Sequence, residues 1–215
     1  MHKTYGSGDG AVHALRGVTL AFRSGRFHAI LGPSGSGKST LLHLAAGLDA
    51  PSRGSVRLLG QETAPLEDAQ LARLRRRSIG FVFQFFNLVP TLTVEENALL
   101  PILLDRRVAA ADHARLDALL ASMELGPKKR RLPEDLSGGE RQRAAIVRAM
   151  MPAPKILLAD EPTGALDSVT GALITRLLRS QATEHGVCLI VVTHDPHVAG
   201  EADEVISLRD GLVVG

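Results

Sequence analysis

The sequence predicts an α/β protein in which short buried strands of a parallel sheet alternate with helices. One observation is a glycine-rich stretch, residues 32–40, that stands between the apolar run 27–31 and the helix-forming segment 41–46. Another is that two later segments of strand length, residues 155–161 and 187–193, are mostly apolar; the first ends in two acids and the second leads into polar residues. Continuous apolar runs of this length are typical of parallel strands that are buried on both faces. With 215 residues, the chain is long enough for one such domain.

The remaining elements of the core follow from apolar spacing and turn residues. Residues 1–10 are polar apart from Tyr5 and are expected to form no strand, whereas residues 18–22 alternate and are expected to form one. Further strands are expected at residues 55–59 and 79–83, helices at 66–77 and 168–184, and a C-terminal hairpin at 204–214 that turns at 209–211.

A helical subdomain is expected from about residue 87 to 151, inserted into the α/β core. Apolar residues such as Leu116 and Leu120 recur there at helical spacing, and prolines separate the segments. The core would then comprise about residues 1–86 and 152–215, and the whole chain, residues 1–215, would form one domain.

Charge and cysteine content exclude several classes of protein. Twenty-five Lys and Arg residues against 23 Asp and Glu give a net charge of +2, which is too balanced to indicate nucleic acid as a partner. Cys188 stands alone inside an apolar run and is expected to be a core residue in a reducing compartment. No apolar run reaches about 18 residues, and the N-terminus has no signal-peptide core, so the protein is expected in the cytosol unless a partner holds it elsewhere.

The glycine-rich stretch fits the P-loop pattern G-x-x-x-x-G-K-[ST] and predicts a nucleoside triphosphate site. Its backbone N–H groups would surround the phosphates at the positive end of the following helix. Lys38 would reach the β- and γ-phosphates, and the Ser39 hydroxyl would bind Mg²⁺. The residues of this expected site are Gly32, Pro33, Ser34, Gly35, Ser36, Gly37, Lys38, Ser39 and Thr40.

Polar residues end three of the predicted strands, and ligands of such sheets gather at the carboxyl ends of strands. These residues are Gln84, the pair Asp160 and Glu161, and His194. Asp160 would hold Mg²⁺, and Glu161 would orient or deprotonate the attacking water. His194 would donate a hydrogen bond to the γ-phosphate. Taken one at a time, each of these polar residues could instead be an ordinary cap at the end of a strand, with no part in a nucleotide site.

A second anion-binding corner is predicted where Ser137, Gly138 and Gly139 precede a helix. One phosphate site needs one P-loop, so this corner suggests that a different chain supplies it to the same nucleotide.

Together these motifs resemble those of the nucleotide-binding subunits of ATP-binding cassette (ABC) transporters, over nearly the whole chain. The matching motifs are Walker A at 32–40, the Q-loop at Gln84, the signature at 136–140, Walker B at 156–160, the catalytic glutamate at Glu161, the D-loop at 164–167 and the switch histidine at His194. The resemblance implies a P-loop NTPase with a RecA-like core, an antiparallel β-subdomain and an inserted helical subdomain.

The resemblance also implies an ATPase whose cofactors are ATP and Mg²⁺. Tyr5 would stack on the adenine, and Gln84 would join Ser39 and Asp160 as a metal ligand. Asp167 of the D-loop would be a further residue of the nucleotide site.

Two kinds of partner are implied by the resemblance. A second copy of the subunit would form an ATP-dependent dimer, in which each ATP lies between one P-loop and the partner's signature. Integral membrane permease subunits would hold the ATPase at the cytoplasmic face of the inner membrane, as a peripheral protein that reaches the membrane only through them. No nucleic acid is expected.

Residues 81–93 and 158–167 are similar to the branch that contains the lipoprotein-release ATPase LolD and the macrolide exporter MacB. A cell-division ATPase of the FtsE type and an importer subunit stay open as alternatives. A soluble ABC ATPase of DNA maintenance belongs to a different class and would carry long insertions between the P-loop and the signature. A P-loop kinase would have no use for the signature.

A site for the permease is expected in residues 84–93, beside the Q-loop. Four apolar residues stand close together there: Phe85, Phe86, Leu88 and Val89. Successive side chains of an extended segment point to opposite sides, so these four cannot all be buried on one side. They therefore suggest a hydrophobic anchor for a partner. The alternative is that they pack the joint between the core and the helical subdomain.

Overall fold

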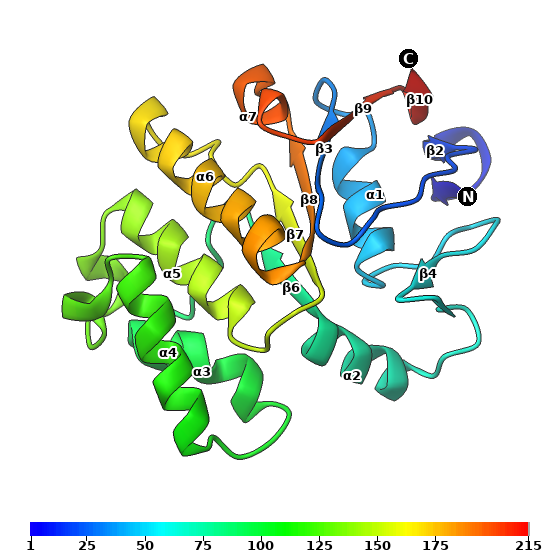
Figure 1. Ribbon diagram of the computed structural model, residues 1–215. Coiled ribbons are helices and arrows are strands. Elements are labelled where there is room, and N and C mark those ends of the chain that lie inside the picture. Colours follow the sequence, from blue (N-terminus) through cyan, green and yellow to red (C-terminus); the bar gives the residue numbers. More distant parts are fainter. Residues whose placement is uncertain (215) are drawn as a thin grey trace.

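A six-stranded, mostly parallel sheet forms the centre of the molecule in the computed structural model, which describes residues 1–214 (Figure 1). Its strands are β3 (Phe27–Leu31), β6 (Ile79–Val82), β7 (Ile156–Asp160), β8 (Cys188–Thr193), β9 (Glu204–Arg209) and β10 (Leu212–Val214). They lie in the order β10-β9-β3-β8-β7-β6, and of these six strands β10 alone runs antiparallel to its neighbour. The predicted parallel strands and the predicted C-terminal hairpin are present.

Helices cover both faces of this sheet. They are α1 (Lys38–Ala45), α2 (Asp68–Ser78), α3 (Val94–Leu103), α4 (Ala110–Ser122), α5 (Gly138–Met150), α6 (Ser168–His185) and α7 (Pro196–Gly200). Successive strand residues point to opposite faces. On one face, Leu158 and Ile190 pack in an apolar cluster with Leu41 of α1, and on the other face Leu157 packs in a second cluster with Ile174 of α6. Burial on both faces explains why these strands are continuously apolar.

Helices α3, α4 and α5 lie together at one end of the molecule (Figure 1). Their facing side chains, among them Ala98, Leu120 and Ile146, are buried in the same cluster as the α6 face of the sheet. The N-cap of α3 is Thr93, whose hydroxyl accepts a hydrogen bond from the backbone N–H of Glu96 in a capping box. These helices lie within the expected helical subdomain, whose boundaries at residues 87 and 151 stay a prediction.

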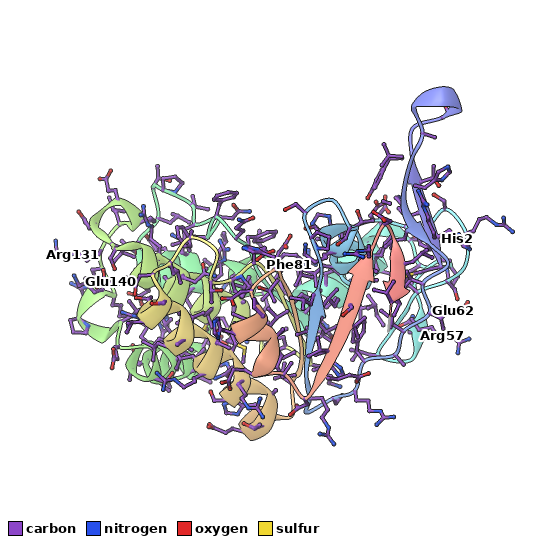
Figure 2. All side chains as sticks on the ribbon, turned by 90° about the horizontal axis from the view of Figure 1, so that it is seen from above. His2, Arg57, Glu62, Phe81, Arg131 and Glu140 are labelled. Atoms are coloured by element: carbon purple, nitrogen blue, oxygen red, sulfur yellow. The ribbon has the colours of Figure 1, made fainter. Side chains whose placement is uncertain are left out.

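Small antiparallel β elements lie at the opposite end. They are β1 (His2–Tyr5), β2 (Val12–Arg16), β4 (Arg57–Leu58) and β5 (Gln61–Glu62), paired β1 with β2 and β4 with β5. Figure 2 shows His2, Arg57 and Glu62 on one side of the molecule and Arg131 and Glu140 on the other. The sheet therefore lies between a helical part and a β part.

Two strand predictions near the N-terminus were wrong. Residues 2–5 form strand β1 although they are polar, because they pair with β2 and this pairing leaves no apolar pattern in the sequence. Residues 18–22 form no strand: Val18 exchanges backbone hydrogen bonds with Met1, and the ladder ends there. The strand expected at residues 55–59 is reduced to the two residues of β4.

Candidate functional site

The carboxyl ends of four neighbouring strands meet at one edge of the sheet. Strands β3, β8, β7 and β6 are parallel neighbours in that order. Strand β3 leads to Gly32, β8 to His194, β7 to Asp160 and Glu161, and β6 to Gln84. The topology thus brings together residues that lie far apart in the sequence, at the edge where α/β sheets bind ligands.

The glycine-rich loop after β3 lies closely against β2. Gly37, the N-cap of α1, has a φ of 98°, and a Cβ there would lie 2.3 Å from the carbonyl oxygen of Ala14, so only glycine fits. Lys38 is buried, and its Nζ donates hydrogen bonds to the carbonyl oxygens of Gly32 (2.8 Å) and Pro33 (3.0 Å). The ammonium group is therefore held against a loop that ends at the first turn of α1, where free backbone N–H groups favour an anion.

Two oxygen ligands suited to Mg²⁺ lie side by side at this loop. The Ser39 hydroxyl on α1 donates a hydrogen bond to Oδ1 of Asp160 on β7, over 3.3 Å. Burial raises the pKa of Asp160, and the neighbouring Glu161 carboxylate raises it further. A divalent cation bound by these oxygens would offset both penalties, and Mg²⁺ prefers oxygen ligands of this kind. The residues present therefore fit the metal.

Glu161 leaves the strand in an unusual backbone conformation. Its φ is 46°, in the left-handed region, and its N–H donates to the carbonyl oxygen of Val192 on β8 (2.9 Å). Its Oε2 lies 2.9 Å from Nδ1 of His194, whose ring is largely exposed. The carboxylate is thus held by an imidazole at the mouth of the site, where it can orient a water or accept its proton.

The Q-loop glutamine, Gln84, and Glu161 both lie close to Gly164. A Cβ at Gly164 would lie 3.6 Å from Nε2 of Gln84 and equally far from Cβ of Glu161, so these side chains border the same small space. These are ordinary contact distances and the φ of Gly164 is not positive, so a side chain at this position would cause neither a close contact nor backbone strain.

The pocket beside the P-loop has a volume of ≈ 610 Å³. This lies within the range of about 300–1,000 Å³ that is typical of small-molecule sites. Tyr5 of β1 and several residues of β2 line it, together with five residues of the loop and of the start of α1: Gly35, Gly37, Lys38, Ser39 and Thr40. His13 and Arg16 of β2 also belong to its lining, and sequence reasoning missed both, because no local pattern marks them.

The position of Tyr5 depends on a distant carboxylate. The Tyr5 hydroxyl donates to Oδ2 of Asp49 (2.8 Å), 44 residues away, and the ammonium group of Lys3 binds the other oxygen of the same carboxylate. The Lys3 ammonium also lies 4.8 Å from the centre of the Tyr5 ring. Asp49 is a further residue that sequence reasoning missed, since it belongs to no motif.

The signature corner lies outside this pocket. Ser137 is the N-cap of α5: its Oγ accepts from the N–H of Glu140 (3.3 Å), and Oε2 of Glu140 accepts from the N–H of Ser137 (2.8 Å). Among the described residues that line the P-loop pocket, none comes from Ser137, Gly138 or Gly139. Asp167 is not among the residues that line this pocket either, and its Oδ1 caps α6 by accepting from the N–H groups of Val169 and Thr170.

The expected hydrophobic anchor divides into exposed and packed residues. Phe85 is 73% exposed. Phe86 is partly buried, with the Arg141 guanidinium 5.4 Å from the centre of its ring. Leu88 packs against the main apolar cluster, and Val89 is half-buried. Phe85 is therefore the residue of this row that a partner can reach.

A parallel sheet, a glycine loop that precedes a helix, a buried lysine and strand-end carboxylates define a P-loop nucleotide-binding protein. Residues 15–164 match the family described as ABC transporter, and the chain belongs to this family. The predicted LolD- and MacB-like branch is confirmed, because relatives of both names match nearly the whole chain.

The lipoprotein-releasing system ATP-binding protein LolD of Anaeromyxobacter dehalogenans is 45% identical over 215 residues, which cover 100% of this chain and 90% of LolD. The macrolide export ATP-binding/permease protein MacB of Brucella melitensis is 47% identical over 212 residues, or 99% of this chain but 33% of MacB. The chain thus spans about a third of the MacB relatives that it matches.

A solved relative has the same fold. The dimeric structure of the ABC transporter cassette MJ0796 of Methanocaldococcus jannaschii superposes with a TM-score of 0.91 and 44% identity, covering 100% of this chain and 94% of that one. Another structure of MJ0796 is a dimeric post-hydrolysis state bound to ADP and Pi. Among residues 1–214, no helix of the present chain is both long and apolar enough to cross a membrane.

Proposed function

We propose that this chain is the ATP-hydrolysing motor subunit of an ABC transporter that drives a separate membrane permease, for export or lipoprotein release. The observation that carries the proposal is the array at one edge of the sheet: Lys38 in the P-loop, Ser39 bonded to Asp160, and Glu161 bonded to His194. The names of the relatives, LolD, MacB and the pyoverdine exporter PvdT, favour export or release over import and over cell division.

The P-loop pocket would hold MgATP. The adenine would stack on Tyr5, whose ring Asp49 keeps in place, and the phosphates would meet the loop N–H groups and Lys38. Lys38 would exchange the carbonyl oxygens of the loop for phosphate oxygens. Ser39, Asp160 and Gln84 would hold Mg²⁺, which neutralises phosphate charge as it develops during the reaction.

Hydrolysis would depend on Glu161. Its carboxylate would orient the attacking water and accept a proton from it. His194 holds the carboxylate at 2.9 Å and would contact the γ-phosphate once the nucleotide is bound. Such positioning supplies most of the catalysis in phosphoryl transfer.

A second copy of the chain would complete the site. The residues that line the P-loop pocket do not include the Ser137 corner of the same chain. The solved relative MJ0796 is dimeric. Each ATP would lie between one P-loop and the partner's Ser137, Gly138 and Gly139. The dimer would act at the cytoplasmic face of the inner membrane, held there by permease subunits.

Two substitutions test the assignment of the nucleotide site. Lys38→Ala removes a charge from the phosphate clamp and should weaken both ATP binding and turnover. Glu161→Gln should lower turnover by about 10²-fold or more while ATP stays bound, because it changes the water-orienting group alone. Nucleotide affinity and hydrolysis are measured in parallel with Mg²⁺ present and absent. Equal losses of affinity in both variants would contradict the roles assigned to Lys38 and Glu161.

A third substitution tests the dimer. With ATP, the Glu161→Gln variant should elute as a dimer in size-exclusion chromatography. Adding Ser137→Arg should return it to a monomer, because a bulky cation would crowd the partner's γ-phosphate site. A dimer that forms without ATP and tolerates Ser137→Arg would refute the shared site.

A further inference from the structure

A buried glutamine links the signature helix to the segment that carries the catalytic carboxylate. Gln142 on α5 is 0% exposed, and its Nε2 donates a hydrogen bond of 2.8 Å to the carbonyl oxygen of Pro162, the residue after Glu161. The bond joins two elements that are 20 residues apart in the chain. None of the roles proposed for the nucleotide site uses Gln142.

Two backbone hydrogen bonds and one hydrogen bond from a side chain hold the chain around Glu161, and they come from different elements. The Glu161 N–H donates to Val192 of β8, and the Glu161 carbonyl oxygen accepts from the N–H of Gly164 at 3.1 Å. These two contacts belong to the sheet and to the turn itself. The contact with Gln142 comes from α5, so it fixes the Glu161 segment relative to that helix.

The same helix begins at the signature corner. Gln142 follows Ser137 by five residues, which is about 7.5 Å along a rigid helix axis. The start of α5 also packs tightly on α6, since a Cβ at Gly139 would lie 2.6 Å from Cγ2 of Thr170. A displacement of the Ser137 corner would therefore be passed along α5 to Pro162, and from there to Glu161.

Packing alone does not account for a glutamine at this position. The Oε1 atom of Gln142 is buried and has no hydrogen-bond partner among the described residues, which carries a desolvation cost. An apolar side chain of similar volume would fill the same space without that cost. What the glutamine adds is the N–H donor to Pro162.

We propose that Gln142 is a positioning residue that couples the two nucleotide sites of the dimer. In the dimer, Ser137 of one chain would meet the partner's ATP, whereas Glu161 of the same chain would act on its own ATP. Loading the first site would press on the Ser137 corner, and the Gln142 bond would bring Glu161 of the second site into position. The proposal rests on the proposed function, because it needs a nucleotide at each of the two corners.

The test replaces the donor and keeps the volume, with Gln142→Met in the chain of 215 residues. The matched control is Gln181→Met: Gln181 is also a buried glutamine, 6% exposed, but it lies on α6 and its Nε2 donates only to the neighbouring Ser180 hydroxyl. ATP hydrolysis is measured against ATP concentration, ATP binding by fluorescence titration, and Tm by thermal melting.

We expect Gln142→Met to lower kcat about tenfold, as expected for the loss of one buried hydrogen bond, and to bring the Hill coefficient for ATP toward 1. The KM for ATP and its Kd should change less than about threefold, because the P-loop is untouched. Both Gln142→Met and Gln181→Met should lower Tm, by similar amounts, but Gln181→Met should leave kcat and the Hill coefficient unchanged. If both variants change Tm alone, Gln142 is only structural and the proposal is overturned.

A second variant keeps the proposal testable if Gln142→Met does not fold. In Gln142→Glu, a protonated carboxyl can donate to Pro162, whereas an ionised one repels its carbonyl oxygen, and burial favours the protonated form. The kcat of Gln142→Glu relative to the unchanged protein should therefore rise as pH falls from 8 to 6. A ratio that does not vary with pH would overturn the role of the donor. If the unchanged protein itself hydrolysed no ATP, the proposed function would fail instead, and the two failures are thus distinct.

Discussion

Replacing Gly37 by alanine should destabilise the nucleotide-free protein more than the same change at Gly35. Both glycines have a left-handed backbone, with φ of 98° and 78°, so each alanine would carry a strain of about 1–2 kcal/mol. The sites differ in their neighbours: a Cβ at Gly37 would lie 2.3 Å from the Ala14 carbonyl oxygen, whereas a Cβ at Gly35 would meet nothing within 4 Å. Gly35→Ala is therefore the matched control for backbone strain.

The close approach at Gly37 adds a second cost. Contacts between a Cβ and another heavy atom below 3.0 Å essentially do not occur, so the loop and β2 must separate. Overpacking of this kind costs about 1–3 kcal/mol. For a chain of this size, 1 kcal/mol corresponds to about 2–4 °C in Tm, so Gly35→Ala should lower Tm by a few degrees and Gly37→Ala by roughly twice as much.

Thermal melting without nucleotide, followed by circular dichroism, measures both variants. Leaving out ATP matters, because the space beside Gly35 belongs to the proposed phosphate site and a bound ligand would confuse strain with lost binding. Equal values of Tm for Gly35→Ala and Gly37→Ala would refute the claim that β2 lies against the loop in solution.

Burial of particular side chains leads to three further predictions. Phe85 is exposed, so Phe85→Asp should leave Tm and basal ATPase activity nearly unchanged but reduce recovery of the permease in pull-down. Phe86 packs under Arg141, so Phe86→Asp should lower Tm. Normal recovery of the permease with Phe85→Asp would place the docking site elsewhere. Burial raises the pKa of Asp160, so the Asp160 carboxyl binds its proton more tightly in the folded protein than in the unfolded chain. The stability that the protonated carboxyl contributes is therefore lost as pH rises through its pKa in the folded protein. Asp160→Asn should therefore raise the Tm of the nucleotide-free protein at pH 7, and this gain should vanish below about pH 3.8, the pKa of the carboxyl in the unfolded chain. Mg²⁺-dependent hydrolysis should be lost in the same variant. A Tm at pH 7 below that of the unchanged protein would contradict the direction of this pKa shift. Burial raises the pKa of the Cys188 thiol to about 11. Iodoacetamide should therefore label Cys188 far more slowly at pH 8 in the folded protein than after unfolding in guanidinium. Equal labelling rates would show that the thiol is accessible in the folded protein.

The parts of the site that are built from adjacent residues could be predicted from the sequence. The P-loop, the helix after it and the apolar strand before it are local patterns, so residues 27–46 could be interpreted without knowing any contact. The gathering of Gln84, Asp160 and His194 also followed, because parallel strands must place their carboxyl ends at one edge of the sheet.

Features that depend on pairing between distant segments became visible only in the folded chain. Polar residues 2–5 form a strand only because β2 lies beside them, and the alternating residues 18–22 do not, since no ladder continues along them. The contacts of Tyr5 with Asp49 and of Gln142 with Pro162 join residues whose separation along the chain leaves no periodicity to read. Likewise, Phe85 and Phe86 are chemically the same, and only the positions of α5 and its arginines decide which of them faces solvent.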